Sequence, residues 1–104
     1  MKTELLRKIR QIAIYERNTG KTDFELLSSM MEEVGELSRD LKIEEKIVGN
    51  TYKTLEEGSI IESVDVLITA LAMYFARGGN ISELEYIMNK KIDKWERNSG
   101  YDPF

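Results

Sequence analysis

The chain has 104 residues, of which 41% are hydrophobic and 33% charged, a size and composition typical of one globular domain covering residues 1–104. Its net charge of −4 argues against a general nucleic-acid-binding surface, and the absence of cysteine and histidine excludes disulfides and disfavours structural zinc. No apolar run has the length of a membrane span and the charged N-terminal segment is no signal peptide, so we expect a soluble, cytoplasmic protein that does not contact a membrane.

Two helices are predicted in the first 41 residues. Apolar residues at helical spacing predict the first helix from Thr3 to about Arg17, and Gly20 is available for a left-handed cap after it. The sequence Thr22-Asp23-Phe24-Glu25 has the form of a capping box and predicts the start of a second helix that reaches about Leu41. The apolar face expected for this second helix consists of Leu27, Met30, Val34, Leu37 and Leu41.

Two more helices are predicted after a connector that covers residues 42–53. Thr54-Leu55-Glu56-Glu57 forms another capping box and predicts a third helix reaching about Arg77. Because this helix is apolar almost all the way round, we expect it to be central or shared between subunits. Gly78-Gly79-Asn80 ends it, and Ser82-Glu83-Leu84-Glu85 is expected to cap a fourth helix. The predicted fold class is therefore all-α.

Four carboxylates lie in pairs on the second and third predicted helices. Glu33 and Glu36 are three residues apart and share one helix face, and Glu62 and Asp65 do the same on the other helix. Two unit charges about 4 Å apart repel each other by roughly 4 kcal/mol at an effective dielectric near 20. If the two pairs face each other, either a cation lies between them or some of the carboxylates are protonated.

The ligands that the chain offers narrow the choice of cation. Ligand sets made only of oxygen suit hard ions, above all magnesium or manganese, whereas a di-iron carboxylate site normally adds a histidine. Magnesium is usually bound by a few carboxylates together with substrate phosphates, so the pattern indicates phosphate-ester or anhydride chemistry. Thr69 and Ala72 lie on the same side of the helix as Glu62 and Asp65, and such small residues leave room for ions, water and substrate.

These motifs resemble those of a known superfamily. Met30 to Leu37 on one helix, Glu62-Ser63-Val64-Asp65 on the next and a basic segment at 90–97 resemble the all-α nucleoside triphosphate pyrophosphohydrolases, and the resemblance covers roughly residues 9–97. That superfamily includes the MazG proteins, the dimeric dUTPases, the dCTP pyrophosphatases and the phosphoribosyl-ATP pyrophosphohydrolases. The resemblance implies a four-helix MazG-like bundle assembled by oligomerisation, as a homodimer or a tetramer, with the second and third helices forming the hairpin that carries the metal site.

The resemblance also implies a reaction and a role for each group. It implies cleavage of a nucleoside triphosphate between the α and β phosphates, giving the monophosphate and pyrophosphate. The purpose would be control of a nucleotide pool or removal of a noncanonical nucleotide. Magnesium, or manganese, would be held by Glu33, Glu36, Glu62 and Asp65. Glu32 would activate the attacking water, with Glu36 as its rival for that role. Basic residues of the last helix would hold the substrate phosphates, and those expected to do so are Lys91, Lys94 and Arg97.

Other interpretations stay open at this point. The carboxylates fit ordinary surface acids and the basic residues fit a solvated helix face. The chain also fits a catalytically inactive helical oligomerisation module or a regulatory partner protein, and phosphoribosyl-ATP hydrolysis is a further option. The base and sugar are not defined, because the segment 14–20 only loosely resembles the lead-in of relatives and no spacing singles out Tyr15, Tyr52 or Tyr74 as a base contact.

Overall fold

Four helices make up the part of the chain that the computed structural model describes, residues 1–45 and 58–102. They are α1 (Thr3–Asn18), α2 (Asp23–Glu44), α3 (Ser59–Ala76) and α4 (Ile81–Ser99). Within the described residues no strand occurs, which confirms the all-α prediction.

The first two helices begin and end close to their predicted positions. The capping box at the start of α2 is present: the Glu25 amide donates to Thr22 Oγ1 over 3.1 Å, and the Thr22 amide donates to Glu25 Oε1 over 3.4 Å. Gly20 has a φ of 110°, which suits the turn between α1 and α2 because glycine has no Cβ to resist it. The helix α2 runs three residues beyond the predicted Leu41, to Glu44.

The starts of α3 and α4 differ from the predictions. The helix α3 begins at Ser59 after an extended Gly58, while the predicted capping box at 54–57 lies outside the described residues. The cap of α4 is Asn80, two residues earlier than the predicted Ser82, because Asn80 Oδ1 accepts a hydrogen bond of 2.8 Å from the Glu83 amide. The Ser82 hydroxyl instead donates to the same oxygen.

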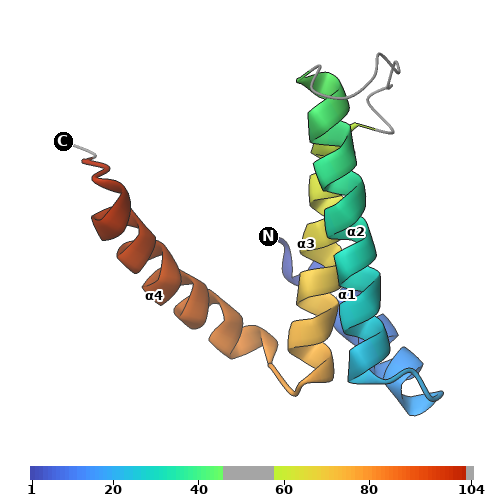
Figure 1. The fold of residues 1–104 in the computed structure, drawn as a ribbon. Coiled ribbons are helices and arrows are strands. Elements are labelled where there is room, and N and C mark those ends of the chain that lie inside the picture. Colours follow the sequence, from blue (N-terminus) through green and yellow to red (C-terminus); the bar gives the residue numbers. More distant parts are fainter. Residues whose placement is uncertain (46–57, 103–104) are drawn as a thin grey trace.

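The helix α3 is central, as predicted, and packs against both α1 and α2 (Figure 1). Its neighbour α2 runs antiparallel to it. The buried core is formed by Leu6, Ala13, Leu71, Phe75 and Leu84, which come from α1, α3 and the start of α4. On α2 the buried side chains are Leu26 and Asp40. Leu27, Val34 and Leu41 of the predicted apolar face are instead exposed, at 41%, 41% and 42%.

Two polar contacts hold the helix ends together at one end of the molecule. The Arg17 guanidinium at the end of α1 donates to the carbonyl of Ala76 at the end of α3. Arg77 forms an ion pair of 2.7 Å with Asp23 at the start of α2, and this hydrogen bond lowers the pKa of the Asp23 carboxyl. Because α1, α2 and α3 are tied at the same end, the relative position of α2 and α3 is defined.

The fourth helix leaves the other three at a sharp corner and extends away from them (Figure 1). At this corner Gly78 has a φ of 95°, and the Tyr74 hydroxyl donates to the Asn80 carbonyl over 2.8 Å. The ring of Tyr74 lies so close to Gly79 that a Cβ at that position would clash with it. Only the first turn of α4 reaches the core, through Ile81 and Leu84. In a single chain, α1, α2 and α3 pack together, and most of α4 lies outside this three-helix bundle.

Two glycine substitutions test this description of the corner. Gly79→Ala is expected to lower the free energy of unfolding by about 1–3 kcal/mol, because the new methyl group displaces the Tyr74 ring. Gly35→Ala, inside α2 with nothing within 4 Å of the added Cβ, is expected to raise it by about 0.5–1 kcal/mol. Urea unfolding followed by circular dichroism measures both values. Equal shifts for the two variants would contradict the close contact at Gly79.

Candidate metal centre

Three of the four predicted carboxylates meet between α2 and α3. Glu33 comes from α2, and Glu62 and Asp65 come from the first two turns of α3. One oxygen from each of these residues lies within 4.8 Å of the others, and all three side chains are half-buried. The i, i+3 spacing places Glu62 and Asp65 on the same face of α3, and the antiparallel packing turns that face toward Glu33. We call this group the carboxylate trio.

The trio contains polar atoms that lack partners. Glu33 Oε2 and Glu62 Oε2 are both inaccessible to water and accept no hydrogen bond from the described protein. Burying charged oxygens in this way costs free energy unless a counter-charge or a donor compensates for it. A divalent cation supplies that compensation, and the all-oxygen donor set suits magnesium or manganese. The residues present therefore fit a hard metal ion.

The electrostatics of the trio affect Glu62 most. Partial burial, contact with the Glu33 carboxyl and the negative charges of Glu36 and Asp65 together raise the pKa of Glu62 to about 7. Near neutral pH and without a cation, the centre therefore retains part of a proton on Glu62.

Glu36 and Glu32, the other two acids of the segment 30–37, are not members of the trio. Glu36 is exposed, one turn from Glu33, and is close enough for its charge to raise the pKa of Glu62. Glu32 is also exposed and lies about 100° around the helix from Glu33, outside the trio. The structure thus places Glu36 beside the centre and Glu32 further from it.

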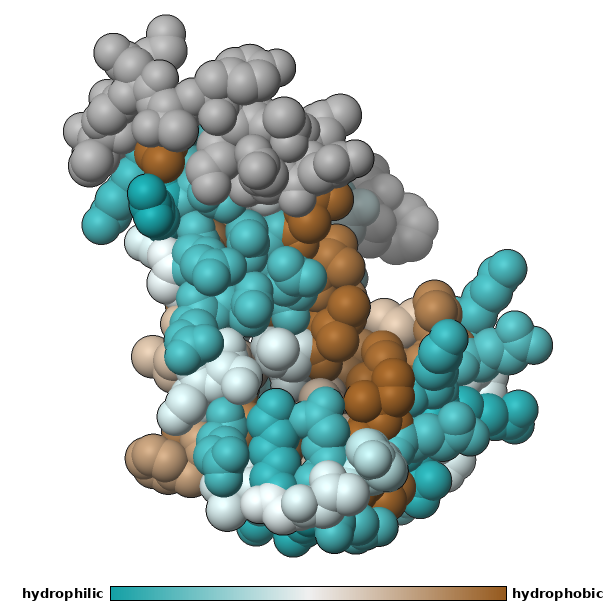
Figure 2. Space-filling model, turned by 90° about the vertical axis from the view of Figure 1, so that its right-hand side faces the viewer, coloured by the Kyte–Doolittle hydropathy of each residue, from teal (hydrophilic) through white to brown (hydrophobic). Residues whose placement is uncertain are grey.

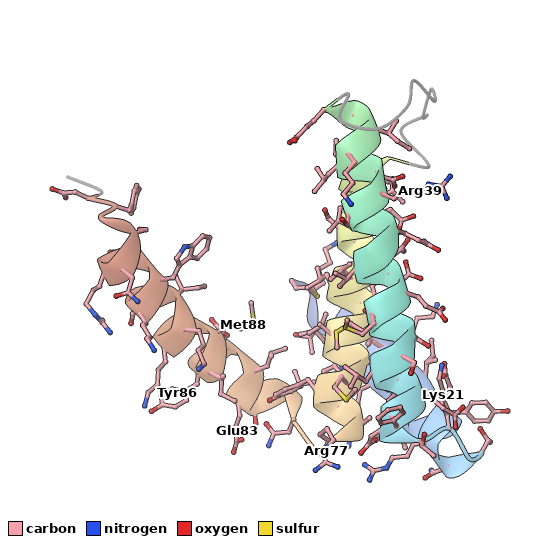
Figure 3. The ribbon with its side chains drawn as sticks, viewed as in Figure 1. Lys21, Arg39, Arg77, Glu83, Tyr86 and Met88 are labelled. Carbon is pink, nitrogen blue, oxygen red and sulfur yellow. The ribbon has the colours of Figure 1, made fainter. Side chains whose placement is uncertain are left out.

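The predicted phosphate-binding residues do not reach the trio within one chain. Lys91, Lys94 and Arg97 are exposed and line an open hollow of about 490 Å³ on α4. This part of α4 extends away from the α2–α3 pair (Figure 1). Figure 3 shows Met88 on the side of α4 that faces α3, with Glu83 and Tyr86 on its other side.

A cavity next to the trio was not predicted. It has a volume of about 170 Å³ and lies between α1, α2 and α3, with Lys21 and Glu16 among its lining residues. The small residues Thr69 and Ala72, which we expected to leave room on α3, line it as well. Neither Tyr15 nor Tyr74 lines this cavity, and Tyr52 lies outside the described residues.

The raised pKa of Glu62 predicts how the stability of the metal-free protein depends on pH. A carboxyl whose pKa is higher in the folded than in the unfolded state stabilises the fold below the unfolded value, here 4.5, and that contribution is lost as the pH rises through about 7. We therefore expect the Tm of the wild type in EDTA to fall between about pH 5 and about pH 8, and Glu62→Gln to remove part of this fall. The exposed Glu4→Gln at the start of α1 is the control, which should follow the wild type. Parallel curves for wild type and Glu62→Gln would contradict the prediction.

Comparisons of the chain with protein families, with curated proteins and with solved structures found no match.

Proposed function

We propose that the protein is a magnesium-dependent nucleoside triphosphate pyrophosphohydrolase, which converts a (deoxy)nucleoside triphosphate and water to the monophosphate and pyrophosphate. The observation that supports this proposal is the carboxylate trio, in which two buried oxygens accept no hydrogen bond. An anionic centre made only of oxygen atoms binds a polyphosphate through a hard cation, since direct contact between carboxylates and phosphates is repulsive. The motif resemblance points to the same reaction.

Each acidic residue has a distinct role in this proposal. Glu33, Glu62 and Asp65 hold the cation, and Glu36 joins them by a rotation of its exposed side chain. Magnesium, or manganese in its place, supplies neutralisation of the polyphosphate charge and a lower pKa for the attacking water. Glu32, at the edge of the trio, orients that water and accepts its proton. Lys91, Lys94 and Arg97 hold the phosphates that leave.

We further propose that the active form is a homodimer, or a tetramer built from dimers, in which the bundle is completed between chains. The chain exposes 8294 Å², against about 6,000 Å² for a compact protein of 12.1 kDa. Its radius of gyration is 16.5 Å, against about 13 Å for a compact chain of this length. The excess surface is larger than the roughly 800 Å² that each partner buries in a standard interface.

The exposed surface is apolar where a partner would be needed. A groove of about 380 Å³ between α1, α3 and α4 is lined by apolar residues that include Leu67, Met88 and Ile92. Figure 2, which shows the side of the molecule turned away from α4, reveals a second band of apolar side chains, next to a hydrophilic face. A second copy packed on the surface of the groove would also bring its own α4 close to the first chain. The basic residues of that α4 would then lie closer to the carboxylate trio of the first chain than the residues of its own α4 do.

The apolar composition of α3 raises the question of whether the protein lies in a membrane or in the cytoplasm. Contrary to the expectation from the sequence, α3 is long and apolar enough to span a membrane, with a mean hydropathy of 1.6 over Ser59–Ala76, and 17% of this segment is buried in the chain. The central helix of a soluble bundle passes the same test, and Glu62 and Asp65 on α3 favour that interpretation because carboxylates are costly in a bilayer. We therefore propose a cytoplasmic protein without membrane or nucleic-acid partners.

One alternative has support of its own. The exposed apolar groove is also what a catalytically inactive oligomerisation module or a regulatory partner protein would present. The two functions differ in one property, because only the enzyme needs the trio to bind a divalent ion.

Release of pyrophosphate from a panel of ribo- and deoxyribonucleoside triphosphates tests the reaction. We expect turnover that requires magnesium and falls by at least about 100-fold in Glu62→Gln and in Asp65→Asn, since each substitution removes a charged ligand. The exposed Glu4→Gln at the start of α1 should keep the wild-type rate. Absence of turnover together with absence of magnesium binding in calorimetry would exclude the enzyme and favour the alternative.

Analytical ultracentrifugation tests the assembly. Wild-type protein at micromolar concentration should sediment as a dimer or tetramer, and Leu67→Glu should shift it to monomer, because the substitution places a charge in the apolar groove. Phe24→Glu, a substitution at a 76% exposed phenylalanine at the start of α2, is the matched control and should leave the assembly intact. A monomeric wild type would refute the proposed assembly.

A further inference from the structure

The helix α3 begins without a side-chain cap of its own. Its first residue, Ser59, follows Gly58, which has extended backbone angles and no side chain that could accept a hydrogen bond. The amides in the first turn of a helix need acceptors from outside the helix, and this end of a helix carries a partial positive charge. The start of α3 therefore needs an acceptor from another part of the chain.

The last residue of α2 supplies such an acceptor. The Ser59 amide donates a hydrogen bond of 3.4 Å to Glu44 Oε1, across the interface between the two helices. Figure 1 shows the end of α2 and the start of α3 side by side, at the end of the bundle away from the corner that leads to α4. A carboxylate next to the positive end of a helix is favourable. Glu44 thus caps α3 from the neighbouring helix.

This contact and the carboxylate trio lie on the same two helix faces. On α2, Glu44 comes about three turns after Glu33 and only about 20° around the helix from it. Between them on that face lies Asp40, which is 2% exposed, so the face is covered over this length. On α3, Ser59 comes about one turn before Glu62. The hydrogen bond at the start of α3 therefore lies close to two members of the trio.

The pair formed by α2 and α3 is tied at both of its ends, with the trio between them. At the other end Arg77, which follows α3, binds Asp23 at the start of α2 over 2.7 Å. The trio itself opposes this packing, because its carboxylates repel one another. Two contacts that lie far apart fix both the register and the angle between two helices, whereas the contact of Arg77 alone would let α3 pivot away from α2.

We infer that Glu44 is a positioning residue for the metal centre: by holding the start of α3 against the end of α2, it sets the separation of Glu62 and Asp65 from Glu33. The inference rests on the proposed function, since it takes the trio to be the group that binds the cation. Glu44 is exposed and is not a member of the trio, so it acts through the position of α3 and not as a ligand.

Two substitutions of Glu44 separate its hydrogen bond from its charge. Glu44→Gln keeps an acceptor oxygen and Glu44→Met does not, while both remove the negative charge. We expect magnesium affinity, measured by calorimetry, to be at least about threefold weaker in Glu44→Met than in Glu44→Gln, a smaller loss than the roughly 10- to 100-fold typical of residues that bind metal ligands directly. Glu45→Met is the matched control, because this exposed neighbour carries the same charge and lies about 100° around the helix from Glu44. It should bind magnesium as Glu44→Gln does.

Nuclear magnetic resonance of the metal-free protein distinguishes this inference from the proposed function. The Ser59 amide should exchange with solvent faster in Glu44→Met than in the wild type or Glu44→Gln, and the amide chemical shifts of Glu62 and Asp65 should change in Glu44→Met alone. If Glu44→Met loses the protection of Ser59 but binds magnesium as tightly as Glu44→Gln, Glu44 is only a helix cap and the inference is overturned. If the wild type binds no magnesium, the proposed function fails, and the shifts of Glu62 and Asp65 then decide whether Glu44 positions α3.

Discussion

The repulsion among the carboxylates of Glu33, Glu62 and Asp65 is the constraint on which the rest of the structure depends. Their oxygens lie within 4.8 Å of one another across the α2–α3 interface, and two of them accept no hydrogen bond. Packing these two helices is unfavourable at this point, so other contacts must hold the helices in place. They are supplied at the opposite end of the pair, where Arg77 binds Asp23, Arg17 binds the Ala76 carbonyl, and Phe75 and Ala76 are buried. Strain at a site that is stabilised elsewhere is typical of functional centres.

The helix α3 has both a carboxylate-bearing side and a large apolar surface, and a single chain does not cover all of that apolar surface. One side must carry Glu62 and Asp65 toward α2, while the remaining surface is apolar and needs cover. Among the described residues, α1 and part of α4 are available for this, and α4 turns away because Gly78, Tyr74 and Gly79 define a sharp corner. Straightening that corner would cover more of α3 in the monomer but would remove the surface that we propose as the interface with a second copy.

Local signals were enough to predict most of the helices, and they failed where two equivalent residues compete. The Thr22 capping box is read from four adjacent residues and is present. At the start of α4, by contrast, Asn80 and Ser82 are both good caps, and the choice is made by the Gly78-Gly79 turn, which brings Asn80 to the Glu83 amide. Leu26 and Leu27 are adjacent on α2 and differ by 100° around the helix, so only packing against the other helices decides which is buried.

The carboxylate trio was accessible to sequence reasoning because its geometry follows from helical spacing and one antiparallel pairing. The cavity was not, because Glu16, Lys21, Ser29 and Thr69 come from four segments with no shared periodicity. The two features are nevertheless coupled, since Ser29 and Glu33 lie on one face of α2, and Thr69 and Asp65 lie on one face of α3. A slide of α2 along α3 would change the separation of the trio and the shape of the cavity together. The registry between these two helices therefore sets the geometry of the carboxylate trio and of the cavity at the same time.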